Sequence, residues 1–400
     1  MHHPRGYLTR FGMTLGLLML LPVAAAWNSA SFRGSEAVPL ETLAPNEVFV
    51  TLGASQKQNV AIKIGYAEKM PAPKVGLFGG HQGQNWEASF LGPDEGEFFN
   101  YFYLIKPSLF ELRDLLYYLA SVGKLPTETV IVHVFTPATE WGRRFVAYQD
   151  ANPLDVTLHA SSLYAGAVGK VRHGLLVLDA VVRWVQGLFS YQSVLSGALG
   201  GGGQLVRLDM EACTRAIRHE ATPLAGWRWA IFKMIPVSVL VKLGLLEVRD
   251  FCRHPELHTY LDYAIYRDGT TVYAPFLLGV PPTPYRPLDR RDRLRFGDED
   301  DIAQALREMD GIVAGAGRRL VFYIPPLYRS GPYVPGPVDD IVDRAMAMVP
   351  GISVIDHRPL MPGAHLALDR MHFKAEYYHA LIAEMRQRGL LGPVAGQNRK

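Results

Sequence analysis

From residue 74 onward, apolar segments of strand length alternate with amphipathic segments of helix length, and this alternation restricts the possible folds more than any other feature. Strands are expected at residues 74–78, 130–135, 320–324 and 354–356, and helices at residues 108–122, 298–313, 338–348 and 374–387. Strands that take turns with helices build a parallel sheet with helices on both faces. The sequence therefore predicts a doubly wound α/β fold.

Residues 150–290 interrupt the alternation, and we interpret them as a largely helical insertion that shapes or covers a site. Within the insertion, residues 224–248 are apolar and aromatic, but Pro236 and several basic residues break the run too often for a membrane span. Two interpretations of this stretch stay open. It forms helices packed on the core, or it lies on a membrane surface.

The part of the chain before the core divides into two regions. Residues 1–27 contain an apolar run that follows Arg5 and Arg10, which is typical of a signal peptide or a short membrane anchor. Residues 28–70 are expected to be an exposed connector followed by two short strands, at residues 48–52 and 60–64. The α/β domain then occupies residues 71–400.

An exported chain of this kind belongs in a bacterial periplasm, either tethered to the inner membrane or released after cleavage. Cys213 and Cys252 would meet oxidising conditions there, so they form a disulfide or remain two separate buried thiols. The net charge of +3 is too small to indicate binding of nucleic acid. The sequence suggests no cofactor, and a bound metal is only one of several interpretations of a histidine described below.

A short motif near the C-terminus carries the chemistry. Asp369 precedes His372 by three residues, on a segment that leads into the last predicted helix. A carboxylate at this spacing can orient an imidazole, and the oriented imidazole can act as a general base. A helix cap and a core histidine are the structural alternatives for these two residues.

Asp369-x-x-His372-Phe373 before a final helix resembles the last sequence block of the SGNH (GDSL-type) hydrolase superfamily. Residues 320–326, an apolar strand that ends in Pro-Pro, and residues 353–356 are similar to the late strands of that fold. The resemblance implies a flavodoxin-like, three-layer α/β domain with esterase or acyltransferase chemistry. It also implies that Asp369 and His372 are catalytic.

Two catalytic positions of that family differ in this chain. The family's serine follows the first core strand, where this sequence has Gly79, Gly80 and His81. The family's oxyanion asparagine follows a later strand, where Thr139 is the nearest hydroxyl. The backbone N–H groups of Gly79 and Gly80 are candidates for an oxyanion hole, or they simply form a tight turn.

His81 at the serine position leaves several interpretations open. It marks a degenerate nucleophile site, it is itself a nucleophilic or water-activating imidazole, or it holds a divalent ion together with His372 and Asp369. A misalignment of this segment is the remaining interpretation. His133 lies in the middle of a predicted strand and is expected to be a buried structural histidine.

Membrane-anchored relatives with this layout resemble the acyl-transfer components of alginate acetylation and teichoic-acid D-alanylation. The resemblance implies acyl-ester modification of an envelope polysaccharide, with an acyl donor and a membrane-bound acyltransferase as possible partners. The alternatives are a pseudo-hydrolase that binds a glycan or a partner protein, and a histidine-centred or metal-dependent hydrolase.

Overall fold

The computed structural model describes residues 40–44, 46–52, 56–79, 86, 88–91, 98–101, 109–134, 154–188, 204–223, 226, 240, 243–247, 249–254, 257, 264–272, 299–329, 332–335, 337–368 and 372–392. Its centre is a five-stranded sheet in which all neighbouring strands run parallel. The strands are β2 (Val75–Gly79), β3 (Phe98–Asn100), β4 (Thr129–His133), β8 (Arg319–Ile324) and β9 (Ser353–Asp356).

The sheet order is β3-β2-β4-β8-β9. If the five strands are renumbered in chain order, with β2 as the first and β9 as the fifth, the order across the sheet is 2-1-3-4-5. This is a doubly wound order, and its switch point lies between β2 and β4. The predicted α/β fold is confirmed at this level. The sequence did not predict β3, which has only three residues and forms an edge of the sheet.

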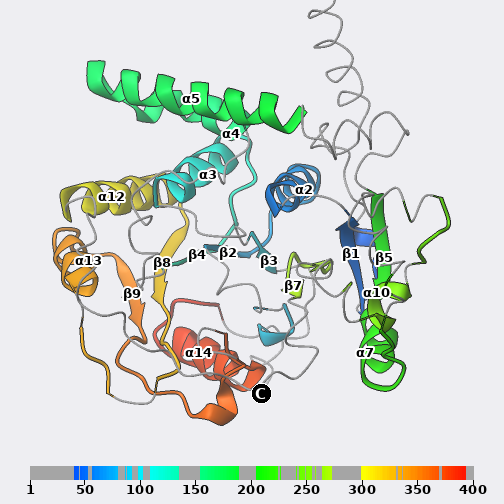
Figure 1. Ribbon diagram of the computed structural model, residues 1–400. Coiled ribbons are helices and arrows are strands. Elements are labelled where there is room, and N and C mark those ends of the chain that lie inside the picture. Colours follow the sequence, from blue (N-terminus) through cyan, green and yellow to red (C-terminus); the bar gives the residue numbers. More distant parts are fainter. Residues whose placement is uncertain are drawn as a thin grey trace, which may run out of the picture.

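Helices cover both faces of the parallel sheet (Figure 1). On one face lie α3 (Leu109–Ser121), α12 (Glu299–Gly315) and α13 (Pro337–Ala347). On the other lie α14 (Ala375–Gln387) and the short helix η3 (Ala88–Phe90). Successive side chains of a strand point to opposite faces of the sheet. Val130 and Val132 of β4 therefore pack with α3, α12 and α13, and Ile131 packs with α14 and η3.

A second sheet joins the start of the chain to the insertion. Its order is β5-β1-β6-β7, and its pairings are antiparallel. The strands are β1 (Glu47–Leu52), β5 (Gln204–Asp209), β6 (Ala264–Ile265) and β7 (Thr271–Val272). The insertion therefore contains strands as well as its helices α4 (Leu154–His159), α5 (Gly166–Leu188), α7 (Met210–His219) and α10 (Asp250–Arg253).

The predicted strand at residues 60–64 is wrong, because this segment belongs to helix α2 (Gln56–Lys69). Val60, Ile62 and Ile64 alternate with other residues and so imitate the period of a strand. In the structure Ile64 and Ala67, one helical turn apart, both pack into the core. The connector is also not wholly exposed, since Leu40 and Leu43 are buried in the same core.

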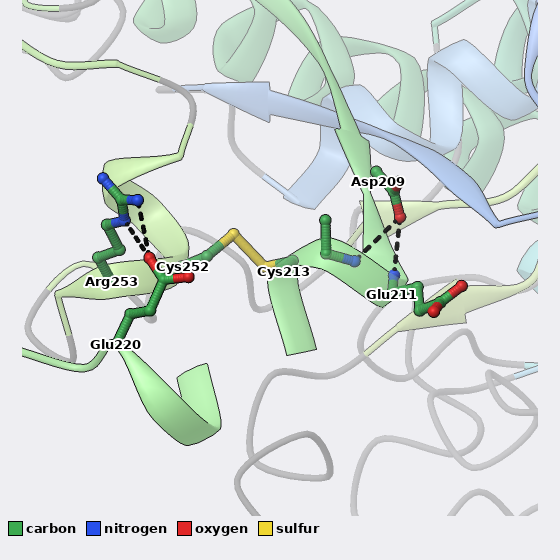
Figure 2. The surroundings of a disulfide bond; sticks show 7 residues. Asp209, Glu211, Cys213, Glu220, Cys252 and Arg253 are labelled. Atoms are coloured by element: carbon green, nitrogen blue, oxygen red, sulfur yellow. Dashed lines mark hydrogen bonds and ion pairs between the residues drawn. A yellow bond between two sulfur atoms is a disulfide. The ribbon is translucent and has the colours of Figure 1, made fainter. Parts of the chain in front are cut away.

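Cys213 and Cys252 form a disulfide that joins α7 to α10, with their Cα atoms 5.1 Å apart (Figure 2). Two further contacts fix these helices. The carboxylate of Asp209 accepts hydrogen bonds from the backbone N–H groups of Glu211 and Ala212 at the start of α7. Arg253 pairs with Glu220 at 2.7 Å. A covalent bond thus holds together two parts of the insertion that are 39 residues apart.

Residues 1–27 and most of residues 224–248 lie outside the described part of the chain. Among the helices that are described, none is both long enough and apolar enough to cross a membrane.

Candidate functional site at the carboxyl edge of the parallel sheet

Two residues mark the switch point of the parallel sheet. Gly79 is the last residue of β2, His133 is the last residue of β4, and the two are register partners. In open α/β sheets, ligands bind outside the carboxyl ends of the strands, at the switch point. The candidate site therefore begins at this pair.

Gly79 is required at its position for two reasons. Its φ of +150° lies in a region that side chains rarely adopt. A Cβ placed on it would lie 2.6 Å from the Cβ of His133 and 2.8 Å from the carbonyl oxygen of His133. The glycine thus allows the ends of β2 and β4 to approach closely.

His133 is buried, with 3% of its surface exposed. The pKa of its imidazole is lowered to about 3, mainly by burial and also by the nearby imidazole of His372, while its own backbone acts in the opposite direction. Its Nδ1 atom has no hydrogen-bond partner among the described residues. His133 is therefore a neutral imidazole at physiological pH, with one nitrogen left for another group.

His372 is also buried, with 1% of its surface exposed. The loop before it is closed by backbone hydrogen bonds from Leu368 N to the carbonyl oxygen of His372 and from Lys374 N to that of Leu366, both 2.8 Å long. Phe373, the next residue, is buried against α14 and forms a bridge with Ala367. These contacts hold His372 near the end of β4, close enough for its charge to act on His133.

Aromatic side chains pack beside His133 on the α14 face of the sheet. The ring of Tyr323 lies 5.2 Å from that of His133 and 5.7 Å from that of Trp86. Trp86 is 1% exposed, and its indole N–H has no partner among the described residues. Two buried polar groups without a described partner, one on Trp86 and one on His133, thus lie close to Tyr323.

A chain of hydrogen bonds continues from Tyr323 to the surface. The hydroxyl groups of Tyr323 and Tyr377 lie 2.6 Å apart, and the hydroxyl of Tyr377 lies 2.7 Å from Nδ1 of His357. Nε2 of His357 lies 2.7 Å from a carboxylate oxygen of Glu384. Burial raises the pKa of both tyrosines, so their hydroxyl groups remain protonated and able to donate.

The insertion reaches the core at the edge strand β3. The backbone N–H of Asn100 donates to the carbonyl oxygen of Asp268 at 2.8 Å, and the Asp268 carboxylate accepts from Ala88 N at 2.7 Å. The side chains of Asn100 and Thr270 both donate to the carbonyl oxygen of Trp86. The β6–β7 turn of the insertion therefore fixes the backbone of Trp86.

The described residues include only part of the predicted site. Gly79 and His372 are present, whereas Gly80, His81, Thr139 and Asp369 lie outside the described residues. His133 is buried, as expected from the sequence, but its place in the strand differs from the prediction. We expected the strand to continue to residue 135 and His133 to be structural, but β4 as described ends at His133 and places it opposite Gly79. A histidine at the end of an apolar run was the available signal.

No family model, no curated protein and no solved structure matches this chain. Two imidazoles at one sheet edge, of which one is kept neutral, can accept and donate protons. Within the described ranges, no group of three histidine, cysteine, aspartate or glutamate side chains is arranged to hold a metal ion.

Proposed function

We propose that this chain is an exported SGNH-like protein that acts in acyl-ester modification of a cell-envelope or secreted polysaccharide, by acyl transfer or by ester hydrolysis. The observation that carries the proposal is the buried imidazole of His372 near the switch point of a sheet with the order 2-1-3-4-5. A histidine at that edge, after the last strand of the sheet, is where the resembled family keeps its general base.

In this proposal His372 removes a proton from water or from a sugar hydroxyl as the oxygen attacks the acyl carbonyl carbon. The ester C–O bond then breaks, and the imidazolium returns the proton to the departing alkoxide. Asp369 would orient the imidazole, and backbone N–H groups at Gly79 and Gly80 would face the developing oxyanion. Because it is neutral, His133 can hydrogen-bond the reacting groups without competing for their proton.

The disulfide between Cys213 and Cys252 supports export, because such bonds persist in oxidising compartments and are rare in the cytosol. The basic and apolar character of residues 1–27 agrees with this location. A periplasmic protein tethered at its N-terminus would lie beside the envelope polymers and beside any membrane-bound acyltransferase.

One observation favours a second function, that of a non-catalytic protein that binds a glycan or a protein partner. The described ends of β2 and β4 carry a glycine and a histidine, and neither supplies a serine or an asparagine. Without a nucleophile the same edge would retain its shape and its hydrogen-bonding groups. A binding protein would therefore keep the fold and the position of His372 but accelerate no ester cleavage.

A third function follows from the presence of two imidazoles, His133 and His372, at one edge. With His81 and Asp369 they would supply the nitrogen and oxygen ligands of a metal-dependent hydrolase. Alternatively, an imidazole would itself attack the ester. These two chemistries differ in their response to chelators.

The experiment that tests these functions is aryl-acetate hydrolysis by the purified full chain, compared with His372→Ala, His133→Ala and His81→Ala. His219→Ala, at an exposed position in α7, is the matched control. We expect His372→Ala to abolish the activity and the control to retain it.

Loss of activity with chelator and its return with a divalent ion would instead indicate a metal site. Equal rates for wild type and His372→Ala would reject the acyl-ester proposal in favour of the binding protein.

A further inference from the structure

Helix α5 carries an apolar stripe on its exposed side. Four side chains are largely in solvent: Val168 is 83% exposed, Val171 65%, Leu175 61% and Leu178 58%. Their spacings of three, four and three residues place them on one face of the helix. A surface helix of a globular protein ordinarily turns such a face toward the core.

Side chains beside and opposite the apolar stripe hold α5 in place through polar and aromatic contacts. The guanidinium of Arg172 lies over the ring of Phe110 at 4.9 Å, and Nε2 of His173 lies 2.9 Å from the carbonyl oxygen of Thr157. The ring of His173 also packs against that of Tyr164. These contacts bind α5 to α3, α4 and the chain between α4 and α5. The helix cannot bury its apolar stripe by rolling without breaking them.

Figure 1 shows α5 on the outside of the molecule, with α4 and α3 between it and the parallel sheet. The 23 residues of α5 make a rod about 35 Å long, given a rise of about 1.5 Å per residue. The apolar stripe therefore lies along an outer side of the protein.

The charges of α5 identify the surface that it fits. The helix contains three basic residues, Lys170, Arg172 and Arg183, and one acidic residue, Asp179, so its net charge is +2. Lys170 is exposed and directly precedes Val171 in the sequence. An apolar face bordered by lysine and arginine is typical of helices that lie in the interface of an anionic membrane.

We propose that the outer face of α5 docks onto an anionic lipid surface, with Val168, Val171, Leu175 and Leu178 inserted among the acyl chains. A second copy of the chain fits this face less well. A two-fold contact would bring the same surface of both copies together and so place their excess positive charges side by side. Anionic headgroups neutralise those charges instead.

The N-terminus makes even weak docking effective. If residues 11–27 are an anchor, then residues 28–39 connect it to the described part of the chain, and 12 extended residues reach about 40 Å. Within that reach, contact of α5 with the same membrane is an intramolecular event at high effective concentration. Docking in this orientation is independent of the chemistry at the carboxyl edge of the sheet.

The test uses the full chain, reconstituted into vesicles of phosphatidylcholine with phosphatidylglycerol. Leu175→Cys carries an environment-sensitive fluorophore, and the described cysteines are both in the disulfide. Val334→Cys, at another exposed apolar position, is the matched control. We expect brominated lipids to quench the label at position 175 and not the label at position 334. Lys170→Gln should lower the ratio of docked to undocked chain about fivefold.

Equal quenching of the two labels would overturn the proposal. A second result would also overturn it. If the label at position 175 is quenched equally in vesicles of phosphatidylcholine alone, and Lys170→Gln does not change the quenching, then anionic lipid has no role. The unlabelled Leu175→Cys variant tests for a second copy of the chain. If its introduced thiols crosslink two copies, and lipid does not quench the labelled variant, then a second copy of the chain covers this face and the proposal is wrong.

Discussion

The Cβ that Gly79 lacks would lie 2.6 Å from the Cβ of His133. Gly79 ends β2, His133 ends β4, and the register pairs them directly. The geometry of the switch point therefore depends on a glycine and a histidine together, and changes at one residue are expected to act through the other.

Gly79→Ala should destabilise the protein by about 2–4 kcal/mol, because the new methyl group meets both a disfavoured φ and the backbone of His133. Gly123→Ala is the matched control, since its φ of +70° is also disfavoured but nothing lies within 4 Å of the added Cβ. We expect about 1 kcal/mol at that position. Urea unfolding of both variants measures the difference, and equal losses would show that β2 and β4 do not meet so closely.

His133 should make the protein sensitive to acid. Its pKa is about 3 in the folded chain and about 6.5 in the unfolded chain, so between these values the unfolded chain binds more protons. The free energy of unfolding should therefore fall as the pH decreases from 6.5, by about 2–3 kcal/mol at pH 4.5. We expect His133→Gln to reduce this slope and His219→Gln to preserve it, as measured by denaturant unfolding at each pH. Identical slopes in all three proteins would contradict the burial of a neutral His133.

Lys63 should affect stability at alkaline pH. Burial lowers its pKa to about 7, opposed by the charge of Asp268, whereas the unfolded value is 10.5. Between these two pKa values the unfolded chain binds more protons than the folded chain. The free energy of unfolding should therefore increase with pH, by roughly 3 kcal/mol from pH 7 to pH 10. We expect Lys63→Met to remove the increase, as measured by denaturant unfolding across this range. Lys124→Met is the control, because Lys124 also donates to a backbone carbonyl.

The Tyr323–Tyr377–His357 chain should behave as one unit. Tyr377→Phe leaves the Tyr323 hydroxyl and Nδ1 of His357 without their shared partner, and should destabilise the protein by about 1–3 kcal/mol. Tyr323→Phe removes one of the same hydrogen bonds. The double variant is therefore expected to lose less than the sum of the single losses, as measured by thermal unfolding. Additive losses would mean that the two hydroxyl groups do not interact.

The parallel sheet could be predicted from the sequence because its strands are apolar runs separated by amphipathic helices. The second sheet could not, since β1 pairs with strands that follow it by more than 150 residues and periodicity carries no information on partners. Residues 60–64 misled the prediction because their alternating apolar residues imitate the period of a strand, although the segment is helical. The burial of His133 could be predicted, but its place opposite Gly79 could not, because the predicted strand continued two residues beyond the end of β4.

The pairing of β1 also constrains how the chain can fold. Glu47 lies opposite Asp209, so β1 has no partner until the ribosome has added some 160 further residues. Until then an apolar strand with two open edges is exposed to other chains. A chain truncated before β5 should therefore aggregate or require a chaperone, although it already contains three of the five strands of the parallel sheet.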